Sequence, residues 1–170
     1  MVKKGDCMNV PKSVLLVCLG NICRSPSAEA VLRQKITQKN LDIVLDSAGT
    51  AGYHIGEKPD NRAITVGEKL GYDLSQLRAR QIQWEDFYRF DIIFAMDKNN
   101  FNDLQKLQKK AQDFHLNQPI GTLLAFDTID VADPYYGNLD DFRQMFVQIQ
   151  KTADNWISIW QNNNQNLTKL

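Results

Sequence analysis

A short apolar run that leads directly into a loop and a helix constrains this chain more than any other feature. The run Val-Leu-Leu-Val predicts a buried strand over residues 12–18. Apolar residues at helical spacing then predict a helix over residues 26–38, with Pro26 in its first turn and Ser25 as its N-cap. A second strand over residues 41–46 completes a right-handed βαβ unit with two parallel strands.

The loop between that strand and that helix has the residues of a phosphate-binding site. Backbone N–H groups of such a loop and the positive end of the helix point to one place, where a phosphate-like anion binds. Cys18 lies in that positive field, which favours a thiolate nucleophile. Arg24 can hold two phosphate oxygens with its planar guanidinium. Ser25 can donate a hydrogen bond to the sulfur, while Gly20 and Asn21 suit a tight turn.

Residues 17–26, Val-Cys-Leu-Gly-Asn-Ile-Cys-Arg-Ser-Pro, resemble the signature of the low-molecular-weight protein tyrosine phosphatases. The plain alternative is a buried cysteine and a surface arginine beside an ordinary connection. Further matches follow in chain order: Ser47-Ala48-Gly49-Thr50, Gly56 with Pro59-Asp60, Ala79-Arg80-Gln81-Ile82, Ala95-Met96-Asp97 and Asp133-Pro134-Tyr135. Because the resemblance covers residues 12–160, it outweighs that alternative.

The resemblance implies an α/β fold with a four-stranded parallel sheet and helices on both faces, the Rossmann-like, three-layer architecture of phosphotyrosine phosphatase I. The remaining predicted elements fit it. They are strands over 90–96 and 122–126 and helices over 61–70, 82–88, 98–110 and 139–161, with Trp84 and Phe87 facing inward. The predicted division is a flexible extension over 1–11, one phosphatase domain over 12–161 and a polar tail over 162–170.

The resemblance also implies roles for individual residues. Cys18 would attack phosphorus, Arg24 would hold the phosphoryl oxygens, and Asp133 would act as general acid and then base. Asp127 and Asp130 are competing candidates for the acid. Predicted substrate-binding residues come from the loop and from two aromatic walls of the cleft: Leu19, Gly20, Asn21, Ile22, Cys23, Ser25, Tyr53 and Tyr135.

Four further expectations concern the surroundings of the loop. In the resembling family the serine at Ser47 supports the loop through Asn21, although a simple turn residue is as good an interpretation. Cys23 would form a disulfide with the nucleophile under peroxide, or would only pack. His54 is expected to be a solvated loop histidine. Leu70 replaces a histidine that many family members carry there, which puts the usual hydrogen-bond network in doubt.

Composition excludes several other classes of function. The 170 residues carry no net charge, so nucleic acid and anionic membranes are not expected partners. No apolar run is long enough to cross a membrane, and no signal peptide is recognisable, so a cytoplasmic protein, a monomer or weak dimer, is expected. Three cysteines and two distant histidines support neither a disulfide scaffold nor a metal site, and no cofactor is expected.

The predicted function is hydrolysis of phosphotyrosine and aryl phosphates through a cysteinyl-phosphate intermediate. The expected partner is a phosphotyrosine-containing protein or a small aryl phosphate. One alternative is an arsenate reductase of the same fold, which needs further cysteines to pass on a disulfide, whereas no cysteine follows Cys23. The other is a phosphate-binding module without turnover.

Overall fold

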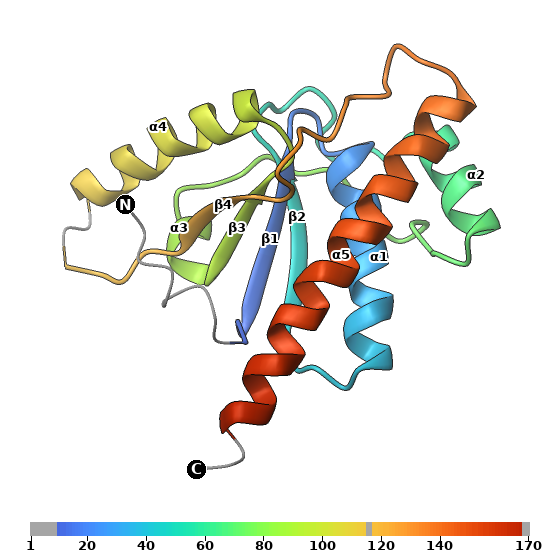
Figure 1. Ribbon diagram of the computed structural model, residues 1–170. Coiled ribbons are helices and arrows are strands. Elements are labelled where there is room, and N and C mark those ends of the chain that lie inside the picture. The colour runs from blue at the N-terminus through green and yellow to red at the C-terminus, as the bar shows by residue number, and fades with distance from the viewer. Residues whose placement is uncertain (1–9, 115–116, 168–170) are drawn as a thin grey trace.

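Four parallel strands form the centre of the molecule (Figure 1). The computed structural model describes residues 10–114 and 117–167. The strands are β1 (Ser13–Cys18), β2 (Val44–Gly49), β3 (Ile92–Ala95) and β4 (Thr122–Ala125), in the order β2-β1-β3-β4. Strand β1 lies inside the sheet and pairs along its length with β2 and β3. The α/β fold class with a four-stranded parallel sheet is therefore confirmed.

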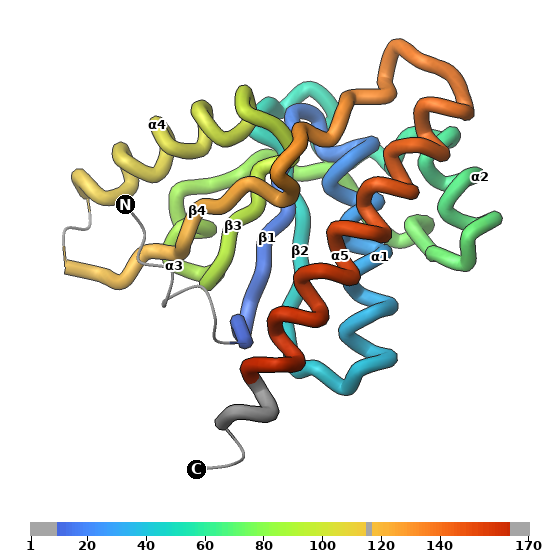
Figure 2. Tube along the Cα trace, in the orientation of Figure 1, coloured from blue at the N-terminus to red at the C-terminus, as the bar shows by residue number. Residues whose placement is uncertain are grey.

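Helices cover both faces of the sheet, as Figures 1 and 2 show. On one face lie α1 (Arg24–Gln38), α2 (Asn61–Lys69) and α5 (Leu139–Leu167); on the other lie α3 (Asp86–Arg89) and α4 (Lys98–Phe114). Successive residues of β1 point to opposite faces, so Leu16 and Cys18 belong to the core under α1 while Leu15 and Val17 belong to the core under α4. The reactive thiol therefore lies on the α1 face.

Several predicted boundaries were wrong in detail, three of them in ways that the contacts explain. The second strand occupies Val44–Gly49, because the Val44 N–H donates to the Lys12 carbonyl and pairing with β1 sets the register from that point. The short helix covers only Asp86–Arg89, and the Trp84 side chain before it is 49% exposed instead of facing inward. Helix α5 continues beyond the predicted end at residue 161, because adding residues to a helix already nucleated costs little.

The two predicted terminal segments are described only in part: residues 162–167 of the predicted tail belong to α5, and residues 168–170 lie outside the described residues. Residues 1–9, Cys7 among them, lie outside the described residues. Within the described part of the predicted extension, Val10 packs against the core. No helix in the described ranges is both long enough and apolar enough to span a membrane.

Candidate active site

The loop after β1 closes around the Cys18 sulfur. The Cys18 side chain is only 2% exposed and lies at the base of a pocket of about 200 Å³. The Asn21 backbone N–H donates to Sγ at 3.3 Å, and the Ser25 Oγ lies 3.0 Å from Sγ. Asn21 has a φ of 56°, a left-handed conformation that asparagine tolerates better than most residues. The turn thus directs a backbone donor at the sulfur.

Helix α1 begins two residues earlier than a Ser25 cap would require. The residue at the N-cap is Cys23, whose side chain makes no capping hydrogen bond, and the first helical residue is Arg24. The Ser25 hydroxyl is instead engaged with the Cys18 sulfur. The predicted capping role of Ser25 is therefore wrong, whereas the predicted contact with sulfur is present.

The Asn21 side chain holds the loop from three sides. Its Nδ2 donates to the Ser25 Oγ at 2.9 Å and to the Ser47 Oγ at 3.0 Å, while its Oδ1 accepts from the Arg80 N–H at 2.9 Å. Because a backbone N–H can only donate, the Arg80 contact fixes the amide orientation. Ser47 therefore does support Asn21, as the resemblance implied.

Glu29 determines the direction of the hydrogen bonds behind the loop. This buried carboxylate accepts from the Ser47 hydroxyl at 2.6 Å, so the Ser47 oxygen is left to accept from Asn21. Both Asn21 Nδ2 hydrogens are then used, and the Ser25 proton is available to the Cys18 sulfur. Burial raises the pKa of Glu29, against the lowering effects of the Ser47 hydrogen bond and of the Arg33 charge.

The sequence reasoning did not identify Glu29. The sequence nevertheless contained a signal for Glu29, because it stands among the apolar residues of a helix. A carboxylate in such a position is rarely buried without a partner, which indicates a hydrogen-bonded group. Glu29 stands between Ala28 and Ala30, and every residue of α1 from Arg24 to Leu32 is buried.

Arg24 connects the loop to two aspartates. Its Nη1 pairs with Asp97 and donates to the Val131 carbonyl at 3.2 Å, and its Nη2 donates to the Asp133 Oδ2 at 3.0 Å. Burial alone would lower the Arg24 pKa, but Cys18, Asp133 and Asp97 raise it, so the guanidinium stays charged. Within the described ranges its Nε is buried and has no hydrogen-bond partner, which leaves a donor for an anion.

Asp97 and the three candidate acids have different surroundings. Asp97 accepts from the Asn100 N–H at 2.7 Å at the start of α4 and also pairs with Arg24, a contact that the sequence did not indicate. Asp127 accepts from Gln148 and Thr152, and Asp130 accepts from the Lys98 N–H at 3.2 Å. Only Asp133 of the three candidate acids lines the pocket with Cys18.

The pocket is lined by aromatic rings, including the two that were predicted. Tyr53 and Tyr135 both line it, although the Tyr53 side chain is 75% exposed. Two further rings lie near Tyr135: the centroid of Tyr136 is 4.9 Å away and that of His54 is 6.2 Å away. The His54 Nδ1 also donates to the Glu57 carboxylate at 2.8 Å, and the ring packs against Gly20. The expectation of a solvated His54 is therefore wrong.

Most of the predicted site residues meet in this pocket. Its lining comprises Cys18, Leu19, Gly20, Ile22, Cys23, Arg24, Tyr53, His54, Asp133, Tyr135 and Tyr136. The predicted residues Asn21 and Ser25 do not line the pocket. Their hydrogen bonds hold the loop in its shape instead. Leu70 is the C-cap of α2 and 44% exposed, and the hydrogen bonds of Asn21 are complete without it.

Within residues 10–114 and 117–167, the structure contains no group of three or more His, Cys, Asp or Glu side chains that could hold a metal ion. Cys18 and Cys23 are free thiols. A cysteine at the base of an anion-binding loop, with a buried arginine and an aspartate in the same pocket of a parallel α/β fold, defines a cysteine-dependent phosphatase.

The family follows from comparison with known proteins. The family model described as low molecular weight phosphotyrosine protein phosphatase matches residues 13–168, and the chain belongs to this family. It is 44% identical over 142 residues to the low molecular weight phosphotyrosine protein phosphatase of Homo sapiens, covering 81% of this chain and 88% of the relative. Its identity to the Dictyostelium discoideum protein of that name is 38% over 164 residues, with coverages of 86% and 92%.

Solved structures agree with this assignment. A protein tyrosine phosphatase from Entamoeba histolytica superposes with a TM-score of 0.78 at 33% identity, covering 89% of this chain and 98% of that one. A drosophila arginine phosphatase superposes with a TM-score of 0.79 at 29% identity, with coverages of 85% and 95%. The enzyme class of the chain is that of the protein-tyrosine-phosphatases.

Proposed function

We propose that Cys18, Arg24 and Asp133 carry out the hydrolysis of phosphotyrosine and aryl phosphates in this chain. The Cys18 thiolate attacks phosphorus in line, the sulfur–phosphorus bond forms, and the bond to the phenolic oxygen breaks. Asp133 gives its proton to that leaving oxygen. Water then attacks the cysteinyl-phosphate while Asp133 takes a proton from it, which releases phosphate and restores the thiolate.

One observation carries this proposal. Arg24 reaches Asp133 at 3.0 Å within a pocket whose base is the Cys18 sulfur. The arginine therefore lies beside the acid in the pocket that contains the nucleophile, where it can hold the phosphoryl group. Phosphoryl oxygens would compete with Asp133 for the Arg24 Nη2, and the carboxyl group would be released towards the leaving oxygen.

The depth of the pocket supports an aryl substrate. The sulfur is almost fully buried, while Tyr53, His54 and Tyr135 line the same pocket. A phenyl ring that carries a phosphate can extend from these rings down to Cys18, whereas the shorter side chain of phosphoserine cannot. We therefore propose phosphotyrosine-containing proteins as substrates in preference to phosphoserine-containing ones.

The test compares the natural chain with Cys18→Ser, in the presence of a chelator. Substrates are para-nitrophenyl phosphate and peptides containing phosphotyrosine, phosphoserine or phosphoarginine, the last because one similar structure is that of an arginine phosphatase. We expect turnover of the phosphotyrosine peptide that Cys18→Ser abolishes and that the chelator leaves unchanged. Full activity of Cys18→Ser would overturn the nucleophile, and faster turnover of phosphoserine or phosphoarginine would overturn the substrate class.

The proposal extends to the location and the oligomeric state of the protein. A thiolate nucleophile with a second thiol beside it requires a reducing compartment, which supports action in the cytoplasm. The exposed large apolar residues are spread over several elements, for example Val44 on β2, Phe114 on α4 and Val147 on α5, which supports a monomer or weak dimer. Sedimentation at several protein concentrations tests the oligomeric state, and a stable dimer at low micromolar concentration would contradict the proposed one.

A further inference from the structure

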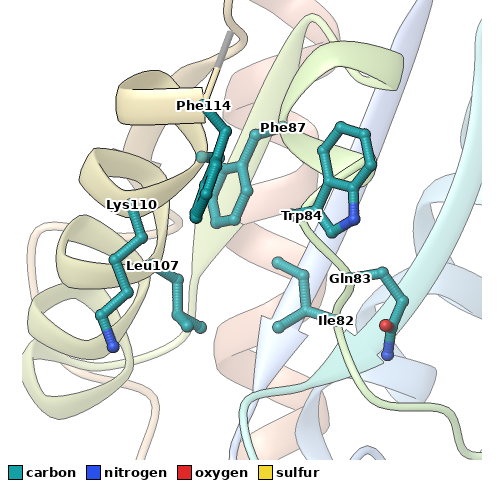
Figure 3. A pocket seen from close by; sticks show the side chains of 8 residues that line it. Ile82, Gln83, Trp84, Phe87, Leu107, Lys110 and Phe114 are labelled. Carbon is teal, nitrogen blue, oxygen red and sulfur yellow. The ribbon is translucent and has the colours of Figure 1, made fainter.

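A second cavity, of about 470 Å³, lies between α4 and the segment that leads into α3 (Figure 3). Its lining residues are Ile82, Gln83, Trp84, Phe87, Leu107, Lys110, Ala111 and Phe114. None of them lines the pocket that contains Cys18. The volume falls within the range of small-molecule sites in proteins, about 300–1,000 Å³.

The walls of this cavity are apolar and rich in aromatic rings. Phe87 and Ala111 are buried, and the Ile82 and Leu107 side chains point into the space between the two elements (Figure 3). Trp84 and Phe114 line the cavity although both are exposed, so aromatic surface is accessible at the opening. Such a lining favours a flat apolar body over a polar solute.

The charge of the lining has one sign. Lys110 is the only ionisable residue among the described residues that line the cavity, and the Gln83 amide is a second polar group of the lining. Over the described ranges, no ion pair is found for Lys110, whereas Lys35 and Lys106 each pair with an aspartate. An anionic group on the ligand would therefore meet an uncompensated positive charge at the edge of an apolar cavity.

From these observations we propose that the cavity is a binding site for a small aromatic anion, a molecule of two or three fused or linked rings that carries a carboxylate or sulfonate. The rings occupy the space between Ile82, Phe87 and Leu107, and the acid group pairs with Lys110. This proposal is independent of the function assigned to the Cys18 pocket.

The probe for the test is 8-anilinonaphthalene-1-sulfonate, whose fluorescence rises in apolar surroundings, and the matched neutral probe is N-phenyl-1-naphthylamine. Titrations are made in saturating inorganic phosphate, because the loop around Cys18 also binds anions. We expect the sulfonate to bind with a stoichiometry of one under these conditions. Loss of its binding in phosphate would place the probe in the active site and overturn the proposal.

Variants separate the charge from the apolar walls. Lys110→Gln should weaken binding of the sulfonate about three- to fivefold, the range expected for a partly exposed ion pair, and leave the neutral probe unchanged. Lys109→Gln, on the exposed part of α4, is the matched control and should change neither probe. Equal sulfonate affinity in the natural chain and in Lys110→Gln would overturn the proposal.

A third variant tests the location of the rings. Leu107→Trp places a large side chain in the cavity and should abolish binding of both probes. Its turnover of para-nitrophenyl phosphate serves as the check that it is folded. A folded Leu107→Trp that still binds the sulfonate with full affinity would contradict the site, and if this variant does not fold, the comparison of Lys110→Gln with Lys109→Gln decides.

Discussion

The Arg62 side chain on α2 donates from Nη2 to the carbonyl oxygen of Tyr135 at 2.9 Å. Its Nη1 donates to the Gly137 carbonyl at 2.9 Å, and its guanidinium lies 4.6 Å from the centre of the Phe142 ring. Asp60 holds the same guanidinium from the other side, and this hydrogen bond lowers the Asp60 pKa. Arg62 therefore ties the loop that carries Asp133 to the body of the protein.

Replacing Arg62 should consequently impair proton transfer more than phosphate binding. We expect Arg62→Ala to lower kcat for aryl phosphates with poor leaving groups about tenfold, because misplacement of a catalytic group by about 1 Å can cost up to a hundredfold. The inhibition constant of inorganic phosphate should change little. Steady-state kinetics with a series of substituted phenols measures both.

The control for Arg62→Ala is Arg78→Ala, because the Arg78 side chain bonds only to nearby backbone carbonyls. Arg62→Lys keeps the positive charge but cannot contact both carbonyl groups in the same way. Its kcat should therefore lie between those of the natural chain and of Arg62→Ala. An equal loss of activity in Arg78→Ala would contradict a specific role of Arg62.

The loss of rate on removal of the general acid should depend on the leaving group of the substrate. We expect Asp133→Ala to slow phenyl phosphate by about 10²–10⁴-fold, the usual contribution of general acid catalysis. Para-nitrophenyl phosphate should lose much less, because its leaving group needs little protonation. Asp130→Ala is the control, since the Asp130 carboxylate bonds to the Lys98 N–H outside the pocket. Equal losses on both substrates would rule out the assignment of Asp133.

Glu29 should change the way in which the free energy of unfolding depends on pH. Because burial raises its pKa in the folded chain, the folded state binds more protons than the unfolded state above the ordinary value of 4.5. The contribution of Glu29 to the free energy of unfolding should therefore fall as the pH rises from 4.5 through the raised pKa. Urea unfolding at several pH values should show a flatter dependence for Glu29→Gln.

The control for this measurement is Glu68→Gln, on the exposed side of α2. The amide that Glu29→Gln introduces keeps an oxygen that can accept from Ser47, so kcat should fall only a few-fold in the variant. The same slope of stability against pH in Glu29→Gln and in the natural chain would contradict this account.

Cys23 is predicted to protect the nucleophile from irreversible oxidation. Burial raises the pKa of the Cys23 thiol, with the charges of Asp60 and Cys18 adding to the effect, so Cys23 stays a thiol when peroxide oxidises Cys18. The sulfenic acid of Cys18 can then condense with the Cys23 thiol to form a disulfide and water. After equal peroxide doses, Cys23→Ser should recover less activity with dithiothreitol, and Cys7→Ser should recover as the natural chain does. Equal recovery in all three would leave Cys23 a packing residue.

Much of the fold could be predicted because its signals are local. The apolar run of β1, the loop and the helix stripe of α1 lie within residues 12–38, where periodicity and turn chemistry agree. The start of β2 could not be located this way, because the apolar residues already begin at Leu41 and only pairing with β1 selects Val44.

The candidate site was predictable where residues stand close together in the chain. Cys18, Arg24 and Ser25 lie close together in the chain, where β1 ends and α1 begins, whereas His54 reaches the mouth of the pocket from a connection whose path depends on contacts with Gly20 and Tyr135. Trp84 was assigned to the core by its apolar character alone, but the segment before α3 leaves half of its surface exposed. Such placements depend on tertiary contacts that periodicity does not encode.

The three partners of Asn21 also set the order in which the protein can become active during synthesis. Ser47 and the Arg80 N–H are 26 and 59 residues further along the chain, and Asp133 follows later still. A nascent chain that ends before residue 80 contains the whole sequence of the phosphate loop but cannot hold its shape. Phosphatase activity therefore reports that nearly the entire domain has been made and folded, and no partly synthesised chain should dephosphorylate its surroundings.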